Sequence, residues 1–215
     1  MSGINFDYME NFIIDMIPEN NGILKEIEDA GKKDSIPIIR KETANFLNLM
    51  VNIKKPKNVL ELGTAIGYSS LMMAINNECI EKLITVEKDK DLISIAQNNI
   101  NKYNCTDRIK IIEGDCLEVL SCLQENFDLI FIDAGKGHYN HYLPFCLKLL
   151  NKDGIIIADN VLFRGMVASK ELVKRRKITI VKRMKEFLKL ITEDPKLLTT
   201  VLPIGDGISV TTRRD

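Results

Sequence analysis

The chain has 215 residues, of which 45% are hydrophobic and 28% charged, and its 30 basic and 30 acidic side chains leave no net charge. This length suits one domain, residues 1–215, with a substantial core, and the composition is that of a soluble globular protein. No apolar run approaches the roughly 18 residues of a membrane span, the N-terminus lacks the features of a signal peptide, and the five scattered cysteines suggest neither disulfides nor zinc, so we expect a cytoplasmic protein without a membrane partner.

Residues 1–55 are predicted to form a helical extension. Helices are expected at 6–17, 20–31 and 40–52, because apolar residues recur there at spacings of three and four. Between the last two, Ser35-Ile36-Pro37-Ile38 is expected to be extended, since the residue before a proline avoids the helical conformation.

Strands and helices alternate over residues 56–215, the predicted α/β core. Strands are predicted at 58–62, 82–87, 108–113, 127–132, 154–158, 197–202 and 207–212, and helices at 68–76, 90–102, 116–124, 138–150 and about 168–192. Such alternation indicates a parallel sheet covered by helices on both faces. The turn-rich segment 203–207 favours an antiparallel hairpin between the last two strands. The predicted fold class is a doubly wound, Rossmann-like α/β sheet of seven mostly parallel strands.

A glycine loop follows the first strand. Gly63 and Gly67 would let the backbone approach a ligand closely at the sheet edge. Their G-x-x-x-G spacing differs from that of dinucleotide-binding proteins, and no phosphate-binding lysine follows. A tight turn that binds no ligand is the alternative interpretation of this loop taken alone.

Acidic residues at the next two strand ends strengthen the ligand interpretation. Glu87 ends the second strand, where a carboxylate can accept both hydroxyls of a ribose, and Asp115 follows the third, where it would suit an adenine amino group. Either residue alone could instead cap a helix. Together with the glycine loop they predict a nucleoside pocket without a phosphate-binding loop, as S-adenosylmethionine requires.

Two later strands end on oxygen ligands. The run 127–132 leads into Asp133, and the run 154–158 leads into Asp159 and Asn160. If the two strands are neighbours in a parallel sheet, these side chains converge at its carboxyl edge, where open α/β sheets bind ligands. Two carboxylates and an amide suit Mg²⁺, Mn²⁺ or Ca²⁺ rather than zinc. The pattern therefore predicts a site for a hard cation.

Charge is unevenly distributed along the chain. Residues 1–30 carry seven acidic side chains and one basic, whereas residues 164–189 carry ten basic side chains and two acidic. A basic segment of this kind indicates either a polyanion-binding face or a solvated helix face.

Three motifs resemble the class I S-adenosylmethionine-dependent methyltransferases: ELGTAIGYS at 61–69, IDAGKGHY at 132–139 and DNVLFRG at 159–165. Over roughly residues 35–215 the chain is similar to the cation-dependent O-methyltransferases of the caffeoyl-CoA and catechol type. The segment LPIGDGI at 202–208 and a basic helix after Gly165 look most like the bacterial subgroup that methylates 5-hydroxyuridine in tRNA. Gly135, where alanine is expected, departs slightly from the pattern. The absence of tryptophan and an expected scarcity of aromatic residues near the site favour RNA over a catechol.

The resemblance implies roles for particular residues. Asp133, Asp159 and Asn160 would hold Mg²⁺, with Mn²⁺ or Ca²⁺ as alternatives. Lys136 would accept the proton of the substrate hydroxyl, since repulsion by a neighbouring cation favours the neutral form of a lysine; without the motif it would be taken as a surface residue. Cofactor contacts are implied for Ile39, Glu61, Gly63, Ser69, Glu87, Gly114, Asp115 and Asp133, and an RNA face for Arg164, Lys174, Arg175 and Arg176.

The function that the resemblance implies is methylation of 5-hydroxyuridine in the tRNA anticodon loop to 5-methoxyuridine, with S-adenosylmethionine and Mg²⁺. The alternative is an O-methyltransferase of small catechol or caffeoyl-type vicinal diols. A nucleoside-binding regulatory module without catalysis and a nicotinamide dehydrogenase are less favoured, the latter because the glycine spacing differs. The resemblance also implies a homodimer.

Overall fold

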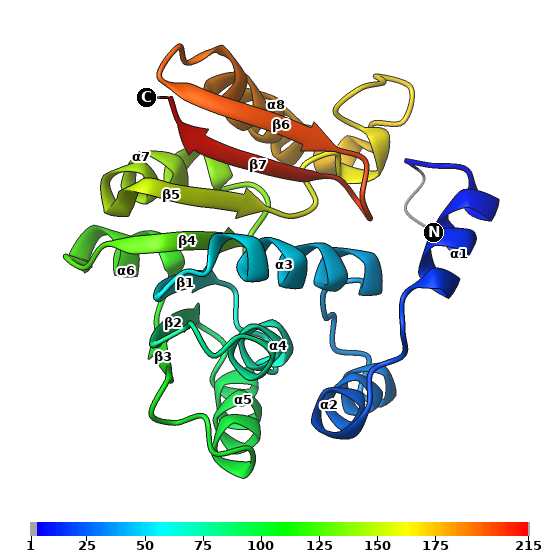
Figure 1. Ribbon diagram of the computed structural model, residues 1–215. Coiled ribbons are helices and arrows are strands. Elements are labelled where there is room, and N and C mark those ends of the chain that lie inside the picture. The colour runs from blue at the N-terminus through cyan, green and yellow to red at the C-terminus, as the bar shows by residue number, and fades with distance from the viewer. Residues whose placement is uncertain (1–3, 215) are drawn as a thin grey trace.

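The computed structural model describes residues 4–214 and shows three N-terminal helices beside an alternating α/β core (Figure 1). The N-terminal helices are α1 (Asp7–Met16), α2 (Gly22–Lys33) and α3 (Lys41–Lys54). The core begins with β1 (Asn58–Leu62), α4 (Tyr68–Asn76), β2 (Lys82–Glu87), α5 (Lys90–Lys102), β3 (Ile109–Glu113) and α6 (Cys116–Cys122). It continues with β4 (Phe127–Ile132), α7 (Tyr139–Leu149), β5 (Leu150–Ala158), α8 (Ile178–Glu193), β6 (Leu197–Leu202) and β7 (Ile208–Arg213).

The strands form one seven-stranded sheet in the order β3-β2-β1-β4-β5-β7-β6. The five strands from β3 to β5 are parallel, and β7 is antiparallel to both β5 and β6. The predicted fold class is therefore confirmed. Strand order reverses between β1 and β4, and ligands of such sheets bind at the carboxyl ends of the strands beside this reversal.

The sheet is buried on both faces, which explains why its strands are nearly continuous apolar runs. On one face, α3, α4 and α5 contribute Leu47, Leu71 and Ile100 to the core. On the other, α6, α7 and α8 contribute Leu120, Tyr142 and Met184. No helix within residues 4–214 is long and apolar enough to cross a membrane.

The last helix was wrongly predicted in its first ten residues. Instead of starting near residue 168, α8 begins at Ile178, after an irregular segment with two short 3₁₀ turns at Phe163–Gly165 and Arg175–Lys177. Four consecutive cations at 174–177 would repel one another on a helix, and the segment lacks a buried apolar face. From Ile178 onward, buried residues recur at helical spacing (Val181, Met184, Phe187, Ile191). The supposed basic helix is therefore partly a loop.

The remaining differences are small. Strand β5 starts at Leu150 rather than 154, because its first residues pair irregularly with β4 around Phe127. Helix α2 is shifted by two residues, and other element ends differ by up to two, within the usual fraying of element termini. Asp89 caps α5, accepting hydrogen bonds from the backbone N–H groups of Asp91 and Leu92, as its position before the apolar spacing suggests.

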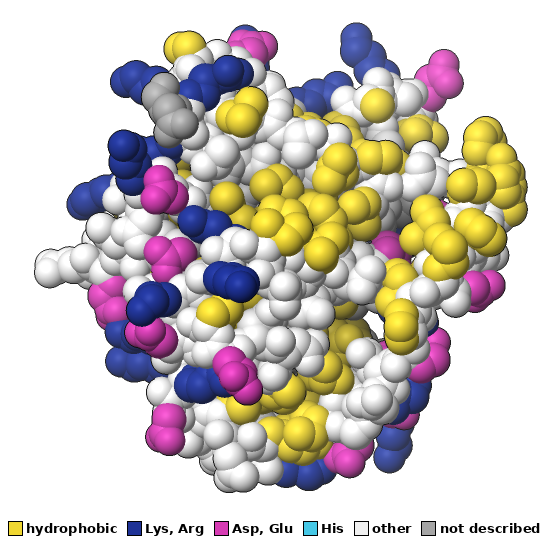
Figure 2. Space-filling view, viewed as in Figure 1, with side chains coloured by type: hydrophobic (Ala, Val, Ile, Leu, Met, Phe, Trp, Pro, Cys, Tyr) yellow, Lys and Arg dark blue, Asp and Glu magenta, His cyan; other side chains and the backbone are white. Residues whose placement is uncertain are grey.

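Helix α1 has its apolar side chains on the outside. Its only buried residue is Glu10, although the segment is rich in large apolar residues. Six large apolar side chains in or just before α1 are at least 39% exposed: Phe6, Tyr8, Met9, Phe12, Ile13 and Met16. Figure 2 shows hydrophobic side chains gathered over this helix and across the centre of the same face. A helix with this arrangement leaves its apolar face without a partner in the single chain.

Candidate active site

A cavity of about 860 Å³ opens at the carboxyl edge of the sheet, where the strand order reverses. Loops after the parallel strands β1 to β5 all contribute to its wall. The predicted residues that line it are Ile39, Gly63, Ser69, Glu87, Gly114, Asp115, Asp133, Lys136, Asp159, Asn160, Arg164, Lys174 and Arg176. Two predicted residues, Glu61 and Arg175, are not on this wall. The cavity thus brings the nucleoside and cation candidates into one site.

The glycine loop lies tightly against the end of β4. Gly63 has a φ of +103°, and a Cβ atom there would lie 2.6 Å from the carbonyl oxygen of Asp133. Gly67 has a φ of +81° and immediately precedes α4. Both positions therefore require glycine, one because of the close approach and both because of the left-handed backbone. At these two positions the loop presents backbone rather than a side chain.

Glu61 supports the glycine loop from behind instead of lining the cavity. Its side chain is fully buried, and its Oε2 atom accepts hydrogen bonds from the hydroxyls of Ser70 and Thr85. The Thr85 hydroxyl is also 2.6 Å from the hydroxyl of Thr64, which does line the cavity. Burial raises the pKa of Glu61 to about 7, although hydrogen bonds from the Ser69, Ser70 and Thr85 hydroxyls act to lower it. Glu61 thus reaches a ligand only through the loop residues that it holds.

The raised pKa of Glu61 predicts a pH-dependent cost in stability. Between about pH 4.5 and 7 the unfolded chain loses the Glu61 proton while the folded chain keeps it, so the free energy of unfolding falls as pH rises. We expect Glu61→Gln to remove this slope and to stabilise the cofactor-free protein at pH 8 by up to about 3 kcal/mol. Urea unfolding at pH 5 and pH 8 measures the free energy of unfolding of both proteins. If this free energy changed with pH equally in the variant and the wild type, the prediction would be contradicted.

Glu87 and Asp115 are fixed by backbone hydrogen bonds. Glu87 accepts from the N–H groups of Lys88 at 2.9 Å and Asp89 at 3.1 Å through one oxygen, and from Ala65 of the glycine loop at 3.1 Å through the other. Asp115 accepts from Leu117 at 2.9 Å and caps α6, which confirms the capping interpretation for this residue. Both still line the cavity, and a carboxylate oxygen can accept more than one hydrogen bond.

The two strand ends that carry the cation candidates are neighbours. Ile132 of β4 pairs with Ala158 of β5, and the backbone N–H of Asp159 donates to the Ile132 carbonyl at 3.0 Å. The residues that follow, Asp133 and Asp159, therefore lie side by side. Asn160 has a φ of +59° and its N–H donates to the Asp159 Oδ1 atom at 2.7 Å. Asparagine tolerates this left-handed backbone better than most residues.

The electrostatics of this pair suit a cation. Burial raises the pKa of both Asp133 and Asp159, and the charge of Asp133 raises the pKa of Asp159 further, while Lys136 lowers both. Two adjacent buried carboxylates are costly unless a proton or a cation neutralises them. Within residues 4–214 no group of three or more His, Cys, Asp or Glu side chains is placed to hold a metal ion. The candidate set consists of two carboxylates and one amide, hard donors that fit Mg²⁺.

Four charged residues on the cavity wall were not assigned to the site by the sequence analysis: Arg40, Lys88, Lys177 and Asp206. Arg40 immediately precedes α3, and Asp206 lies in the turn between β6 and β7. Burial raises the pKa of Asp206, whereas a hydrogen bond from the Arg164 backbone and the charges of Lys136 and Arg40 lower it. The segment 202–208, noted only for its resemblance, was the signal that could have identified Asp206; nothing in the sequence marked Arg40.

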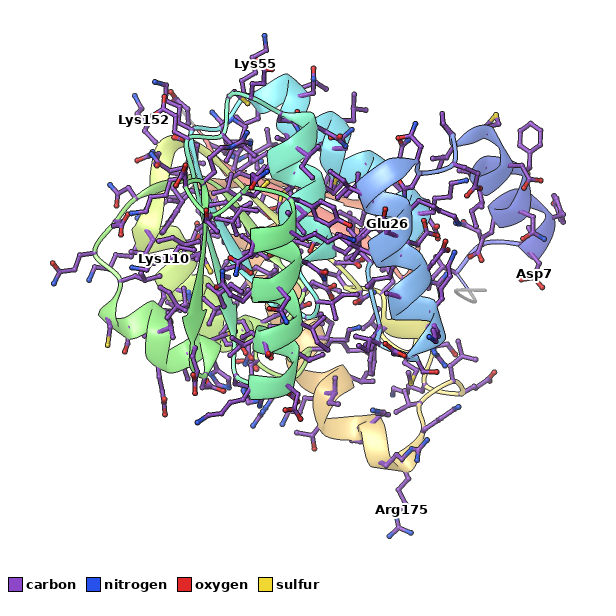
Figure 3. All side chains as sticks on the ribbon, turned by 90° about the horizontal axis from the view of Figure 1, so that it is seen from below. Asp7, Glu26, Lys55, Lys110, Lys152 and Arg175 are labelled. Carbon is purple, nitrogen blue, oxygen red and sulfur yellow. The ribbon has the colours of Figure 1, made fainter. Side chains whose placement is uncertain are left out.

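The basic segment is only partly at the cavity. Lys177 lines it together with Arg164, Lys174 and Arg176, whereas Arg175 extends away from the molecule (Figure 3). The expected scarcity of aromatic residues near the site was wrong, since Tyr68, Tyr142, Phe163 and the His138 ring lie on the cavity wall. The Nζ atom of Lys177 is 6.0 Å from the centre of the Phe163 ring. The wall therefore offers both cationic and aromatic surfaces.

The fold and the cavity together define an S-adenosylmethionine-dependent methyltransferase. The protein family described as O-methyltransferase matches residues 15–214, and the chain belongs to this family. It is 33% identical to the catechol O-methyltransferase of Niastella koreensis, over 75% of this chain and 76% of that one. It is 30% identical to a caffeoyl-CoA O-methyltransferase of Mesembryanthemum crystallinum, over 88% and 79% of the two chains. The SAH-bound structure of a Podospora anserina methyltransferase superposes with a TM-score of 0.88 at 26% identity, covering 97% and 95%.

Proposed function

We propose that the protein methylates one hydroxyl of a catechol or caffeoyl-type vicinal diol with the help of Mg²⁺. The observation that carries this proposal is the adjacency of Asp133 and Asp159, on paired strands, in the same cavity as the glycine loop. The activities named for the Niastella and Mesembryanthemum relatives support this substrate class over RNA. A catechol also fits a cavity wall that carries aromatic side chains.

Different residues would bind the cation, position the two reactants and accept the proton. Asp133, Asp159 and Asn160 would hold Mg²⁺, whose positive charge favours the ionised form of a substrate hydroxyl. The glycine loop and Ser69 would position the methyl donor, and Tyr68 and Phe163 would orient the substrate ring. Lys136, on the same wall, would take the hydroxyl proton at Nζ. Holding both reactants in line accounts for a large part of the expected acceleration.

A second candidate substrate is 5-hydroxyuridine in tRNA. The observation that favours it is the set of cations on the cavity wall, which includes Arg40, Arg164, Lys174, Arg176 and Lys177. A free catechol has no phosphate for them to contact, whereas RNA and a coenzyme A thioester do. The 5-hydroxyl and O4 of the base are adjacent oxygens, so the same chemistry applies to it.

One assay separates the candidates. Purified protein with S-adenosylmethionine and Mg²⁺ is offered a catechol, a caffeoyl-type thioester, or tRNA containing 5-hydroxyuridine, and methylated product is measured by mass spectrometry. We expect the catechol to be methylated. Methylation of the tRNA alone, with a rate that falls steeply with salt, would support the second candidate. Binding of the cofactor without transfer to any of the three would indicate a regulatory module and contradict the proposal.

A matched pair of variants tests the cationic wall. Arg176→Ala removes a charge from the cavity, and Arg175→Ala removes the neighbouring charge that points away. Only Arg176→Ala should raise the KM for an anionic substrate, and neither variant should change the KM for a catechol.

We also propose that the protein acts as a homodimer. The support is the exposed apolar surface of α1, together with the hydrophobic side chains at the centre of the same face (Figure 2). Helix α3 crosses this face in Figure 1, and its Leu49 and Ile53 are 54% and 67% exposed. Burial against a second copy would remove this surface from water. Sedimentation equilibrium should give about twice the 24.4 kDa of the chain, and a monomer at micromolar concentration would contradict it.

A further inference from the structure

The turn between β6 and β7 holds the loop that follows the proposed cation ligands. The backbone N–H of Val161 donates to the Gly207 carbonyl at 3.0 Å, and that of Leu162 donates to the Asp206 carbonyl at 3.0 Å. The backbone N–H of Arg164 donates to the Asp206 side-chain oxygen Oδ1. Three hydrogen bonds thus connect a distant hairpin turn to the five residues after Asp159.

The held loop has an unfavourable backbone conformation. Asn160, Phe163 and Arg164 have φ values of +59°, +46° and +56°, in the left-handed region that non-glycine residues avoid. Such a conformation is unfavourable for a residue with a side chain, and it persists only where the surroundings fix it. The turn packs closely enough to do so, since a Cβ atom on Gly207 would lie 2.3 Å from the Leu162 side chain.

Asp206 is the side chain through which the turn reaches furthest along this loop. It is 7% exposed and lines the same cavity as Asp159 and Asn160. Within the described residues its Oδ1 atom accepts a hydrogen bond from the Arg164 backbone, and its second oxygen accepts none. The turn's own carbonyls already hold residues 161 and 162, so Asp206 determines the position of the last, left-handed part of the loop.

We propose that Asp206 is a positioning residue for the cation site: by holding the Arg164 N–H it keeps the left-handed loop that places Asn160 beside Asp159. This inference rests on the proposed function, because it presumes that Asp133, Asp159 and Asn160 bind a cation. Residues that orient metal ligands typically change metal affinity 10- to 100-fold when they are replaced. Asp206 acts through a hydrogen bond that a neutral acceptor can also make.

The test measures the affinity for Mn²⁺ alone, from the free-ion signal in electron paramagnetic resonance. Asp206→Ala should weaken Mn²⁺ binding by about 10-fold or more, whereas Asp206→Asn, whose amide oxygen can accept the same bond, should stay within about threefold of wild type. S-adenosylhomocysteine affinity, measured by calorimetry, should not change in either variant. The matched control is Asp194→Ala, because Asp194 accepts a backbone N–H from Lys196 at 2.8 Å in the turn before β6, at the other end of the hairpin.

The proposal would be overturned by any of the following outcomes. Wild-type Mn²⁺ affinity in Asp206→Ala would remove its basis, and equal weakening in Asp206→Asn would mean that negative charge, not the hydrogen bond, matters. Absence of Mn²⁺ binding by the wild-type protein would refute the proposed function as well, which separates the two failures. If Asp206→Ala does not fold, Asp206→Glu replaces it, since it keeps the charge but displaces the carboxylate; wild-type affinity there also overturns the proposal.

Discussion

Replacing Asp159 with alanine is expected to abolish methyl transfer while S-adenosylhomocysteine still binds. Asp159 is 2% exposed and follows the strand that pairs with the one before Asp133, so its loss removes one of two carboxylates from the proposed cation site. A catalytic metal ion is worth several kcal/mol of charge stabilisation, which corresponds to a rate loss of at least about 1,000-fold. Single-turnover assays and calorimetry with S-adenosylhomocysteine measure the two properties separately.

Chelation provides the matching experiment on the wild-type protein. Treatment with EDTA should lower the rate as much as Asp159→Ala does, and added Mg²⁺ should restore it only in the wild type. If the variant lost cofactor affinity and turnover equally, Asp159 would hold the methyl donor instead of a cation. Retained activity in EDTA would show that the carboxylate pair serves another purpose.

Replacing Lys136 with alanine should lower kcat by about 100- to 10,000-fold, the usual contribution of a positioned proton acceptor. Lys136 lies on the cavity wall three residues beyond Asp133, and its charge lowers the pKa of both Asp133 and Asp159. Lys136→Arg should not restore the rate, because an arginine stays protonated and cannot accept the proton. The dependence of kcat on pH, measured with Mg²⁺ at saturation, should flatten in both variants.

The control for Lys136 is an exposed lysine far from the cavity. Lys152 lies on the opposite part of the molecule from Arg175 (Figure 3), and Lys152→Ala should leave kcat and KM unchanged. Full activity of Lys136→Arg would show that Lys136 contributes positive charge rather than proton transfer.

The elements that the sequence predicts well are those whose burial leaves a periodic pattern. The strand before Asp133 is apolar on both faces because helices cover both, so its extent and its end are visible in the residues. The segment before α8 has no such pattern. Its lysines and arginines are compatible with a solvated helix. Only the repulsion among these neighbouring charges and the lack of a buried apolar face favour a loop.

The site residues that directly follow buried strands could be predicted from the sequence. Those that tertiary packing brings to the cavity from other parts of the chain could not. Asp133, Asp159 and Asn160 directly follow buried strands, so their convergence follows from strand pairing. Arg40 comes from the N-terminal extension and Asp206 from an antiparallel turn, and their arrival at the cavity depends on packing that no local pattern encodes. Glu61 was placed among the cofactor contacts because of its motif, but its side chain points into the protein toward Ser70 and Thr85.

The close approach of Gly63 to Asp133 joins the glycine loop to the strand end that carries a proposed cation ligand. Backbone meets backbone there, with no side chain between them to absorb a displacement. A ligand that shifts the glycine loop is therefore expected to shift the carbonyl of Asp133, whose carboxylate is a proposed cation ligand. Thermodynamic reciprocity then requires that whatever factor the donor exerts on cation affinity, the cation exerts on donor affinity. Cation affinity measured with and without bound S-adenosylhomocysteine therefore gives the size of this coupling.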